Sequence, residues 1–155
     1  MERIPITRDG FNILKIELEN LKKNERPDVI RAIQIARAHG DLSENAEYEA
    51  AKERQSFIET RIRELEYKLG NADVVDTENL PKDRALFGTI VKLENIDTGE
   101  EVTYQLVGMD ESDIEKGRIS VASPLGKAIL GKKPGEAVVL YAPGGKRTYE
   151  LVDIL

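Results

Sequence analysis

Two carboxylates, Asp41 and Glu44, stand three positions apart in the segment 38–48, which reads AHGDLSENAEY. Further carboxylates follow along the chain at Glu47, Glu49 and Glu53. Oxygen ligands are the kind that magnesium prefers, and magnesium often keeps several waters while using only one or two protein carboxylates. Asp41 and Glu44 are therefore suited to complete a magnesium shell that another protein begins.

Helix capping explains the same spacing without any chemistry. Asp41 could cap a following helix while Glu44 closes an arrangement like a capping box, and spacing alone favours this interpretation. The chain has no cysteine, one histidine and no serine in a nucleophile-elbow setting, so an independent hydrolytic site is hard to assemble. Any catalytic use of the two carboxylates would therefore be shared with a partner. His39, beside Gly40, is interpreted as part of a helix end and not as a metal ligand.

A first helical stretch should lead into this segment. Phe11, Leu14, Leu18 and Leu21 step by 3, 4 and 3, which places them on one helical face, and Thr7 is the predicted cap. Pro27 lacks an amide proton and clashes with the preceding turn, so a kink or short break is predicted near 24–26. The apolar pattern resumes at Val29, and His39-Gly40 is predicted to end the helix.

A second helix is predicted to start near 42–45 and to run to about Leu69. Its apolar seam alternates by 3 and 4 and contains one polar member, at positions Tyr48, Ala51, Gln55, Ile58, Ile62, Leu65, Leu69 and Ala72. The connection is short, which makes the two helices antiparallel neighbours in a coiled-coil hairpin. Roughly 27 helical residues at about 1.5 Å each give an arm of about 40 Å, which suggests reach.

The chain then changes to short alternating runs separated by turn residues. These runs predict strands over 72–75, 87–93, 102–107, 119–121, 138–141 and 149–154. Ser123 and Pro124 look like the cap and first residue of a short helix through Leu130. The fold class is therefore α+β, a helical hairpin followed by an antiparallel sheet with one short helix. The aromatic residues of these runs are assigned to the core: Phe87, Tyr104, Tyr141 and Tyr149.

The change of pattern divides the chain into a hairpin domain at 1–76, a linker at 77–84 and a second domain at 85–155. Net charge is -6 and the sequence pI is about 5.0, which argues against strong independent binding to duplex DNA. The start of the chain lacks the layout of a secretory signal and no apolar run approaches the roughly 20 residues of a membrane span, so a cytoplasmic location is expected.

Segment 39–48, HGDLSENAEY, closely resembles the hairpin-tip signature of the Gre transcript-cleavage factors of bacteria. Segments 120–131, SVASPLGKAILG, and 143–145, PGG, resemble the elements of the same family's C-terminal domain, which is FKBP-like. The resemblance covers essentially the whole chain.

The resemblance implies a mechanism that the residues alone do not give. In such factors the hairpin enters the secondary channel of bacterial RNA polymerase, and the acidic tip helps hold a second Mg²⁺ beside the polymerase's own metal while water cuts a backtracked transcript. Asp41 and Glu44 would take that role, with Leu42, Ser43 and Asn45 shaping the tip. The factor would then have no complete active site and no tightly bound cofactor of its own, and it would not be an enzyme.

The resemblance also implies a basic patch facing the 3′ end of the nascent RNA. Arg37 and Lys52 lie on opposite arms near the tip, and Arg26 lies 11 residues before Arg37, close to three helical turns. Ordinary solvated charges paired with Glu49 or Glu53 explain these residues equally well. The basic set is small, which places the chain nearer the less basic branch of the family.

The second domain is expected to dock on the polymerase. The region assigned to docking contains Ser123, Pro124, Gly126, Gly144 and Gly145. Three alternatives stay open: a relative that enters the same channel and inhibits the polymerase, a peptidyl-prolyl isomerase with a hairpin insert, and a non-catalytic coiled-coil adaptor. Retention of both tip carboxylates argues against the first, and the low aromatic content of 5% argues against the second.

Overall fold

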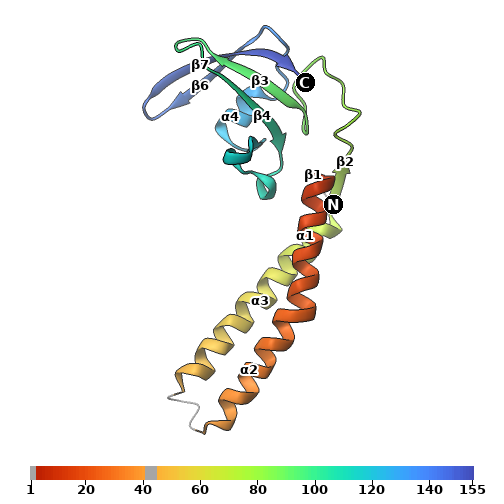
Figure 1. Ribbon diagram of the computed structural model, residues 1–155, viewed down its shortest axis with the longest axis vertical. Coiled ribbons are helices and arrows are strands. Elements are labelled where there is room, and N and C mark those ends of the chain that lie inside the picture. The colour runs from red at the N-terminus through yellow and green to blue at the C-terminus, as the bar shows by residue number, and fades with distance from the viewer. Residues whose placement is uncertain (1–2, 41–44) are drawn as a thin grey trace. The chain divides into compact units, whose positions relative to one another are not determined.

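The computed structural model describes residues 3–40 and 45–155, so Asp41, Leu42, Ser43 and Glu44 lie outside the described residues (Figure 1). The chain forms two compact units. One is built on Phe11–Ala72, and the other joins Pro5–Gly10 to Asp73–Leu155. No helix among the described residues is both long and apolar enough to cross a membrane.

Four consecutive helical segments form the hairpin (Figure 1). They are α1 (Arg8–Asn20), η1 (Leu21–Glu25), α2 (Arg26–Ala38) and α3 (Ala46–Gly70). The predicted seam is confirmed at its centre, where the buried side chains are Leu14, Leu21, Val29, Ile33, Ala36, Ile58, Ile62 and Leu65. Because these residues recur at helical spacing on both arms, burying them holds the arms side by side.

Ion pairs across the two arms reinforce this seam. Arg61 Nε donates to Glu17 Oε2 at 2.6 Å, and Arg61 Nη2 donates to Glu17 Oε1 at 3.1 Å. These hydrogen bonds to the Glu17 carboxylate raise the pKa of Arg61 above its ordinary value. A forked guanidinium that meets both carboxylate oxygens fixes orientation as well as charge, so this pair helps to set the register of the arms.

Of the kink or short break predicted near 24–26, the break does not occur. The chain stays helical through 21–25 as one wide π turn, in which Arg26 N donates to Leu21 O, five residues back. Pro27 then falls in the first turn of α2, directly after the π turn. A π turn accommodates one extra residue, so the apolar stripe continues from Leu21 to Val29.

The predicted helix caps are partly confirmed. Thr7 caps α1, since its hydroxyl accepts from Gly10 N at 3.1 Å. Asn45, not Asp41, caps α3, with Oδ1 accepting from Tyr48 N at 3.0 Å. The helix end predicted at His39-Gly40 is confirmed, because His39 is the C-cap of α2 and Gly40 has φ +103.

A two-stranded sheet pairs β1 (Ile4–Thr7) with β2 (Ala72–Val75), and sequence analysis missed β1. Next to it, the Glu111 carboxylate accepts hydrogen bonds from Thr7 N at 3.1 Å and Gly108 N at 3.3 Å, and also from the Thr7 hydroxyl. Residues 104 positions apart are joined in this way. Glu111 therefore attaches Thr7, the cap of α1, to the second unit.

The second unit contains a sheet of five strands in the order β5-β4-β3-β7-β6. The strands are β3 (Ile90–Asn95), β4 (Glu101–Val107), β5 (Arg118–Ser120), β6 (Ala137–Ala142) and β7 (Gly145–Ile154). The prediction of a purely antiparallel sheet is wrong at one edge, where β4 and β5 are parallel. Two 3-10 turns, η2 (Met109–Glu111) and η3 (Ile114–Lys116), carry the chain back so that β5 runs in the same direction as β4. The sheet is therefore mixed, and the α+β class is confirmed.

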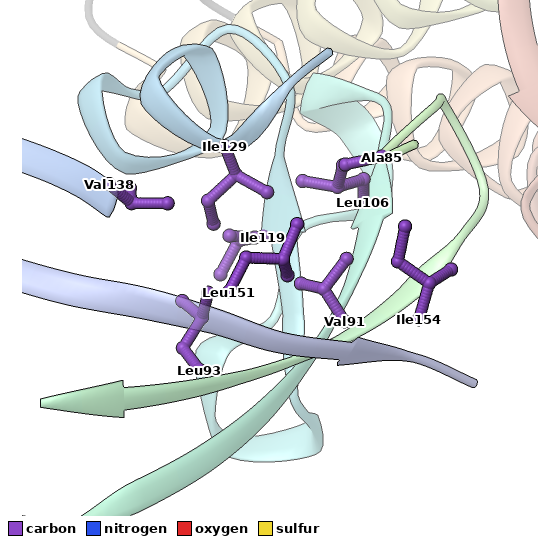
Figure 2. Close-up of a cluster of buried hydrophobic side chains, with 9 residues drawn as sticks. All are labelled: Ala85, Val91, Leu93, Leu106, Ile119, Ile129, Val138, Leu151 and Ile154. Atoms are coloured by element: carbon purple, nitrogen blue, oxygen red, sulfur yellow. The ribbon is translucent and has the colours of Figure 1, made fainter. Parts of the chain in front are cut away.

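Helix α4 (Pro124–Ile129) covers one face of this sheet. Figure 2 shows its Ile129 pointing toward Ile119 and Leu151 of the strands. The buried cluster around them contains Ala85, Val91, Leu93, Leu106, Ile119, Ile129, Val138, Leu151 and Ile154. Burial of nine apolar side chains gives this unit a core of its own.

Candidate functional site

The described part of the hairpin end consists of the last turn of α2 and the first turn of α3. His39 N donates to Ala36 O at 3.1 Å and Gly40 N donates to Arg37 O at 3.3 Å, so the end of α2 is closed by its own backbone. The described residues resume at Asn45, which is the N-cap of α3. The structure thus describes the residues that flank Asp41 and Glu44 on each side and not the two carboxylates themselves.

Exposed carboxylates continue from this end along α3. Glu47 and Glu49 lie in its first turn, and Glu53 follows one turn later, all with exposed side chains. Negative charge near a helix N-terminus is favoured by the helix dipole, which accounts for part of this acidity without a functional role. Among the described residues, no three histidine, cysteine or carboxylate side chains gather closely enough to hold a metal ion.

Asn45, predicted to shape the tip, touches both arms. Its Nδ2 donates to Ala36 O of α2 at 2.7 Å, while its Oδ1 accepts from Tyr48 N of α3 at 3.0 Å. The side chain is half-buried. Periodicity and residue spacing do not predict such a contact, because it joins two helices that are separated by a turn.

Arg37 and Lys52, predicted to form a basic patch, line the same hollow on the hairpin. The hollow measures about 170 Å³ and is bordered by Ile30, Ile33, Gln34, Arg37, Lys52 and Gln55. The Arg37 guanidinium carbon lies 6.0 Å from the centre of the Tyr48 ring, and Lys52 Nζ donates to Gln55 Oε1 at 3.4 Å. Within residues 45–155 and 3–40, neither cation pairs with Glu49 or Glu53.

Arg26, the third predicted member of the basic patch, is placed differently. Its Nε and Nη2 donate to Glu59 Oε2 at 3.0 and 2.8 Å, across the two arms. It does not line the hollow that contains Arg37 and Lys52. The structure therefore brings two of the three predicted basic residues together and gives the third a partner in the hairpin.

The residues of the predicted docking region have different surroundings in the structure. Ser123 caps α4, accepting from Gly126 N at 3.0 Å and donating to Ser120 O at 2.7 Å, and Ser123 and Pro124 line an open hollow of about 520 Å³. Gly126 is buried, and a Cβ there would lie 2.0 Å from Ser120 O. Gly144 lies with Pro143 in the turn between β6 and β7, and Gly145 is the first residue of β7, paired with Ala142 of β6.

The same hollow contains apolar residues that sequence analysis missed or misplaced. Tyr141, assigned to the core, is 78% exposed, because its side chain stands on the outward face of β6 while Val138 faces the core. Ile114 of η3 is 66% exposed and lines the hollow with Leu125 and Pro143. Alternation along β6 indicates an outward Tyr141 once Val138 is placed in the core.

Known proteins match the chain over both units. Residues 4–74 match the family described as "Transcription elongation factor, N-terminal", and residues 80–155 match "Transcription elongation factor, GreA/GreB, C-term". The chain therefore belongs to the GreA/GreB family of transcription elongation factors.

Within the family, the chain is most like GreA. It is 55% identical over 154 residues to the transcription elongation factor GreA of Rhodospirillum rubrum, covering 99% of this chain and 98% of that protein. It is 52% identical to the protein of the same name from Syntrophobacter fumaroxidans, covering 99% of each. Among solved structures, GreA factor homolog 1 (Gfh1) of Thermus thermophilus is 31% identical with a TM-score of 0.46, covering 99% of both chains.

Proposed function

We propose that this elongation factor binds bacterial RNA polymerase, inserts its hairpin through the secondary channel and stimulates the polymerase's own cleavage of the nascent RNA at its 3′ end. The observation that carries the proposal is the pair Asp41 and Glu44 in a segment bounded by two helix ends, in a chain of the GreA/GreB family. Helix α3 has 25 residues, and at about 1.5 Å each it is about 37 Å long. An arm of this length suits a function at the bottom of a channel.

Asp41 and Glu44 supply hard oxygen donors, which suit Mg²⁺, but two carboxylates are fewer ligands than a complete metal site uses. The remaining ligands would come from the polymerase. A magnesium ion shared in this way supplies the second cation of a two-metal hydrolysis of the RNA phosphodiester. In this scheme Asp41 and Glu44 position that ion and orient the attacking water, and the chain is not an enzyme by itself.

Arg37 and Lys52 would face the extruded RNA. Their hollow offers two positive charges beside amide groups of Gln34 and Gln55, a combination that suits a phosphate and a base edge. Arg26 is left out of this role because Glu59 neutralises it. The net charge of -6 argues that contact with nucleic acid is confined to this small region.

The second unit would dock on the polymerase through its apolar hollow. Tyr141 and Ile114 are exposed there beside Pro124, and exposed apolar side chains gathered in one hollow are typical of a protein contact. A prolyl isomerase remains the competing function for such a hollow. Turnover of a proline-containing peptide would support it, and none is expected.

The direct test is RNA release from stalled bacterial elongation complexes in magnesium. The variant Asp41→Asn, Glu44→Gln should lose stimulation and return cleavage to the polymerase's own rate, because neutral amides bind magnesium much more weakly than carboxylates do. The matched control is Glu47→Gln, Glu49→Gln, which removes the same charge from exposed positions of α3 and should retain stimulation.

Circular dichroism should show the same helix content for both double variants. If the Asp41→Asn, Glu44→Gln variant stimulates RNA release as strongly as the wild-type chain does, the proposal is contradicted and the coiled-coil adaptor is favoured. Slower RNA release with the wild-type chain than without it would favour the inhibitory relative.

A further inference from the structure

Positive charge is concentrated in one part of an acidic chain. Residues 118–147 contain six basic side chains and one carboxylate, whereas the whole chain has a net charge of -6. The six basic residues are Arg118, Lys127, Lys132, Lys133, Lys146 and Arg147. The segment runs from β5 through α4 and β6 into β7, so all of it belongs to the second unit. This unit therefore contains a strongly basic segment although the chain is acidic.

Three of these cations lie at the apolar hollow of the second unit. Arg118 lines the hollow directly. Lys146 is paired with Tyr141, and Arg147 with Leu140, across β6 and β7, and both of these β6 residues line the hollow. Directly opposite residues of two antiparallel strands project from the same face. Lys146 and Arg147 therefore stand beside side chains that border the hollow.

Helix α4 adds a fourth cation. Lys127 follows Pro124 by three residues, which places it on the same side of the helix, and Pro124 lines the hollow. The side chains of Lys127, Lys146 and Arg147 are exposed, and that of Arg118 is half-buried. These four residues are named the basic rim.

The basic rim has no partner of its own. On the hairpin, basic side chains meet carboxylates, as Arg61 meets Glu17 at 2.6 Å. Within residues 3–40 and 45–155, no member of the basic rim forms an ion pair. Like charges on one small surface repel one another and gain nothing from pairing. A negative charge outside the chain explains their position better than the stability of this unit does.

The positive charge does not surround the hollow completely. At η3, Lys116 pairs with Asp113 at 4.0 Å and Glu115 is exposed. The sides formed by β5, α4 and the turn between β6 and β7 remain positive. A partner that fits this surface should therefore present its negative charge to those three sides.

We propose that the basic rim receives an acidic surface of the polymerase, with an apolar side chain of that surface entering the hollow. The inference rests on the proposed function, in which the second unit docks on that enzyme. Stable protein interfaces have an apolar centre and a polar rim, and the exposed Ile114 and Tyr141 with cations beside them match this arrangement. Charge on the rim speeds the encounter and selects the partner.

A nucleic acid is the other ligand that a basic surface could take. Binding to phosphates would leave the apolar side chains of the hollow in water, among them Ile114, Leu125 and Pro143. A protein surface covers these side chains and neutralises the cations at the same time. An acidic protein surface is therefore the occupant that uses both features.

The test measures how tightly the labelled chain binds bacterial core RNA polymerase free of nucleic acid, over a range of salt concentrations. Lys146→Gln, Arg147→Gln removes two charges of the basic rim. The control Lys132→Gln, Lys133→Gln removes the same charge from residues of this unit that do not line the hollow. Both double variants should unfold at the wild-type temperature.

At low salt the rim variant should bind about three- to twentyfold more weakly than wild type, mainly through slower association. The difference should shrink as salt rises, because salt screens the attraction. The control should bind like wild type. All three proteins should reach the same maximal rate of RNA release at saturating concentration, since the change affects docking alone.

A carbodiimide cross-link identifies the partner's chemical group. The reagent activates a carboxylate, which then forms an amide with a nearby lysine amine and releases the reagent as a urea. Lys146 in the bound complex should be joined to an aspartate or glutamate of the polymerase, located by mass spectrometry. Lys146→Arg keeps the charge without the amine, so it should keep its affinity and lose the cross-link.

Equal affinity of the rim variant and wild type at low salt would overturn the inference and leave the proposed function standing. An equal loss of affinity in the Lys132→Gln, Lys133→Gln control would also overturn it, by assigning the effect to net charge. Weaker binding only to a polymerase that carries DNA and RNA would assign the basic rim to nucleic acid. If the wild-type chain neither binds the polymerase nor stimulates RNA release, the proposed function itself fails, and this inference fails with it.

Discussion

Arg26 and Arg37 lie on the same helix and have different surroundings. Arg26 makes two hydrogen bonds to one oxygen of Glu59 on the facing arm. Arg37 lies over the ring of Tyr48, 6.0 Å from its centre, in a hollow shared with Lys52. Sequence spacing predicts that both arginines lie on one face, but it contains no information on which of them a glutamate from the other arm reaches.

Arg26→Ala should therefore lower hairpin stability, and Arg37→Ala should lower RNA release. Loss of the partly exposed Arg26 pair should cost about 0.5–1 kcal/mol in urea unfolding. Arg37→Ala should leave unfolding nearly unchanged and weaken stimulation most at low salt, because salt screens a contact with phosphate and reduces the contribution that Arg37 makes at higher salt. Arg31→Ala, at an exposed position of the same helix, is the control and should change neither measurement.

The opposite pattern would reverse the two roles. A drop in RNA release at saturating factor from Arg26→Ala, with unfolding unchanged, would restore Arg26 to the RNA-facing set. Unchanged RNA release from Arg37→Ala at every salt concentration would assign Arg37 to its contact with Tyr48 alone.

At the scale of the element, two of the three glycines of the predicted docking region, Gly126 and Gly144, have opposite surroundings. Gly126 lies where α4 approaches β5, and an added Cβ would meet Ser120 O at 2.0 Å, a backbone atom that cannot turn away. Gly144 has open space around its Cβ position and no positive φ. The first glycine therefore serves packing, and the second can be replaced.

Gly126→Ala should destabilise the second unit by about 1–3 kcal/mol or more, because α4 must shift away from the sheet. Gly144→Ala should be neutral to within about 0.5 kcal/mol, as a substitution on an open surface. Thermal unfolding followed by near-ultraviolet signals from the tyrosines of this unit measures both. Equal stability of the two variants would show that α4 moves freely on the sheet.

Most of the elements could be predicted because their signals are local. The apolar steps along both arms, Thr7 before α1 and Ser123 before α4 all act within a few residues, and each is confirmed. The parallel pairing of β4 with β5 could not be predicted, because alternation gives the face of a strand and not its direction. The π turn was also missed, because Pro27 indicates an interruption without saying that a wider turn can absorb it.

The candidate site shows the same division. The residue types and spacing of Asp41 and Glu44 are plain in the sequence, and the resemblance to Gre factors gives them a role. That role stays a prediction, since the two residues lie outside those that the structure describes. The bond from Asn45 to Ala36 could not be predicted, because it depends on how two arms meet.

At the scale of the whole molecule, the two compact units do not follow a single cut in the chain. Pro5–Gly10 belong with Asp73–Leu155, and the Glu111 carboxylate makes that connection by accepting from Thr7 N. A contact over 104 residues leaves no periodic trace in the sequence. The second unit therefore contains the first turn of the helix that leads into the hairpin.

Because the hairpin and the second unit have separate cores, a change at the hairpin tip should abolish stimulation of RNA cleavage without abolishing binding to the polymerase. The Asp41→Asn, Glu44→Gln variant retains the hairpin seam and the apolar hollow around Tyr141, so it should still occupy the polymerase. An excess of this variant should suppress stimulation by the wild-type chain in proportion to its concentration. RNA release with both proteins present measures this competition.

The control for competition is Tyr141→Ser added to the same double variant. It removes an exposed apolar side chain from the hollow and should require a higher concentration to compete. Absence of competition by the double variant, while its helix content matches wild type, would show that the two carboxylates are needed for binding as well as for cleavage.

The π turn at Leu21–Glu25 allows the number of residues in this arm of the hairpin to change without rotating the part of the helix that follows it. In an unbroken α-helix of 3.6 residues per turn, gaining or losing one residue rotates everything beyond it by about 100°. A π turn that reverts to an α turn releases one residue without that rotation. Lineages of this family could therefore lengthen or shorten the arm by a residue at this one place and still present the same face of α2 to α3.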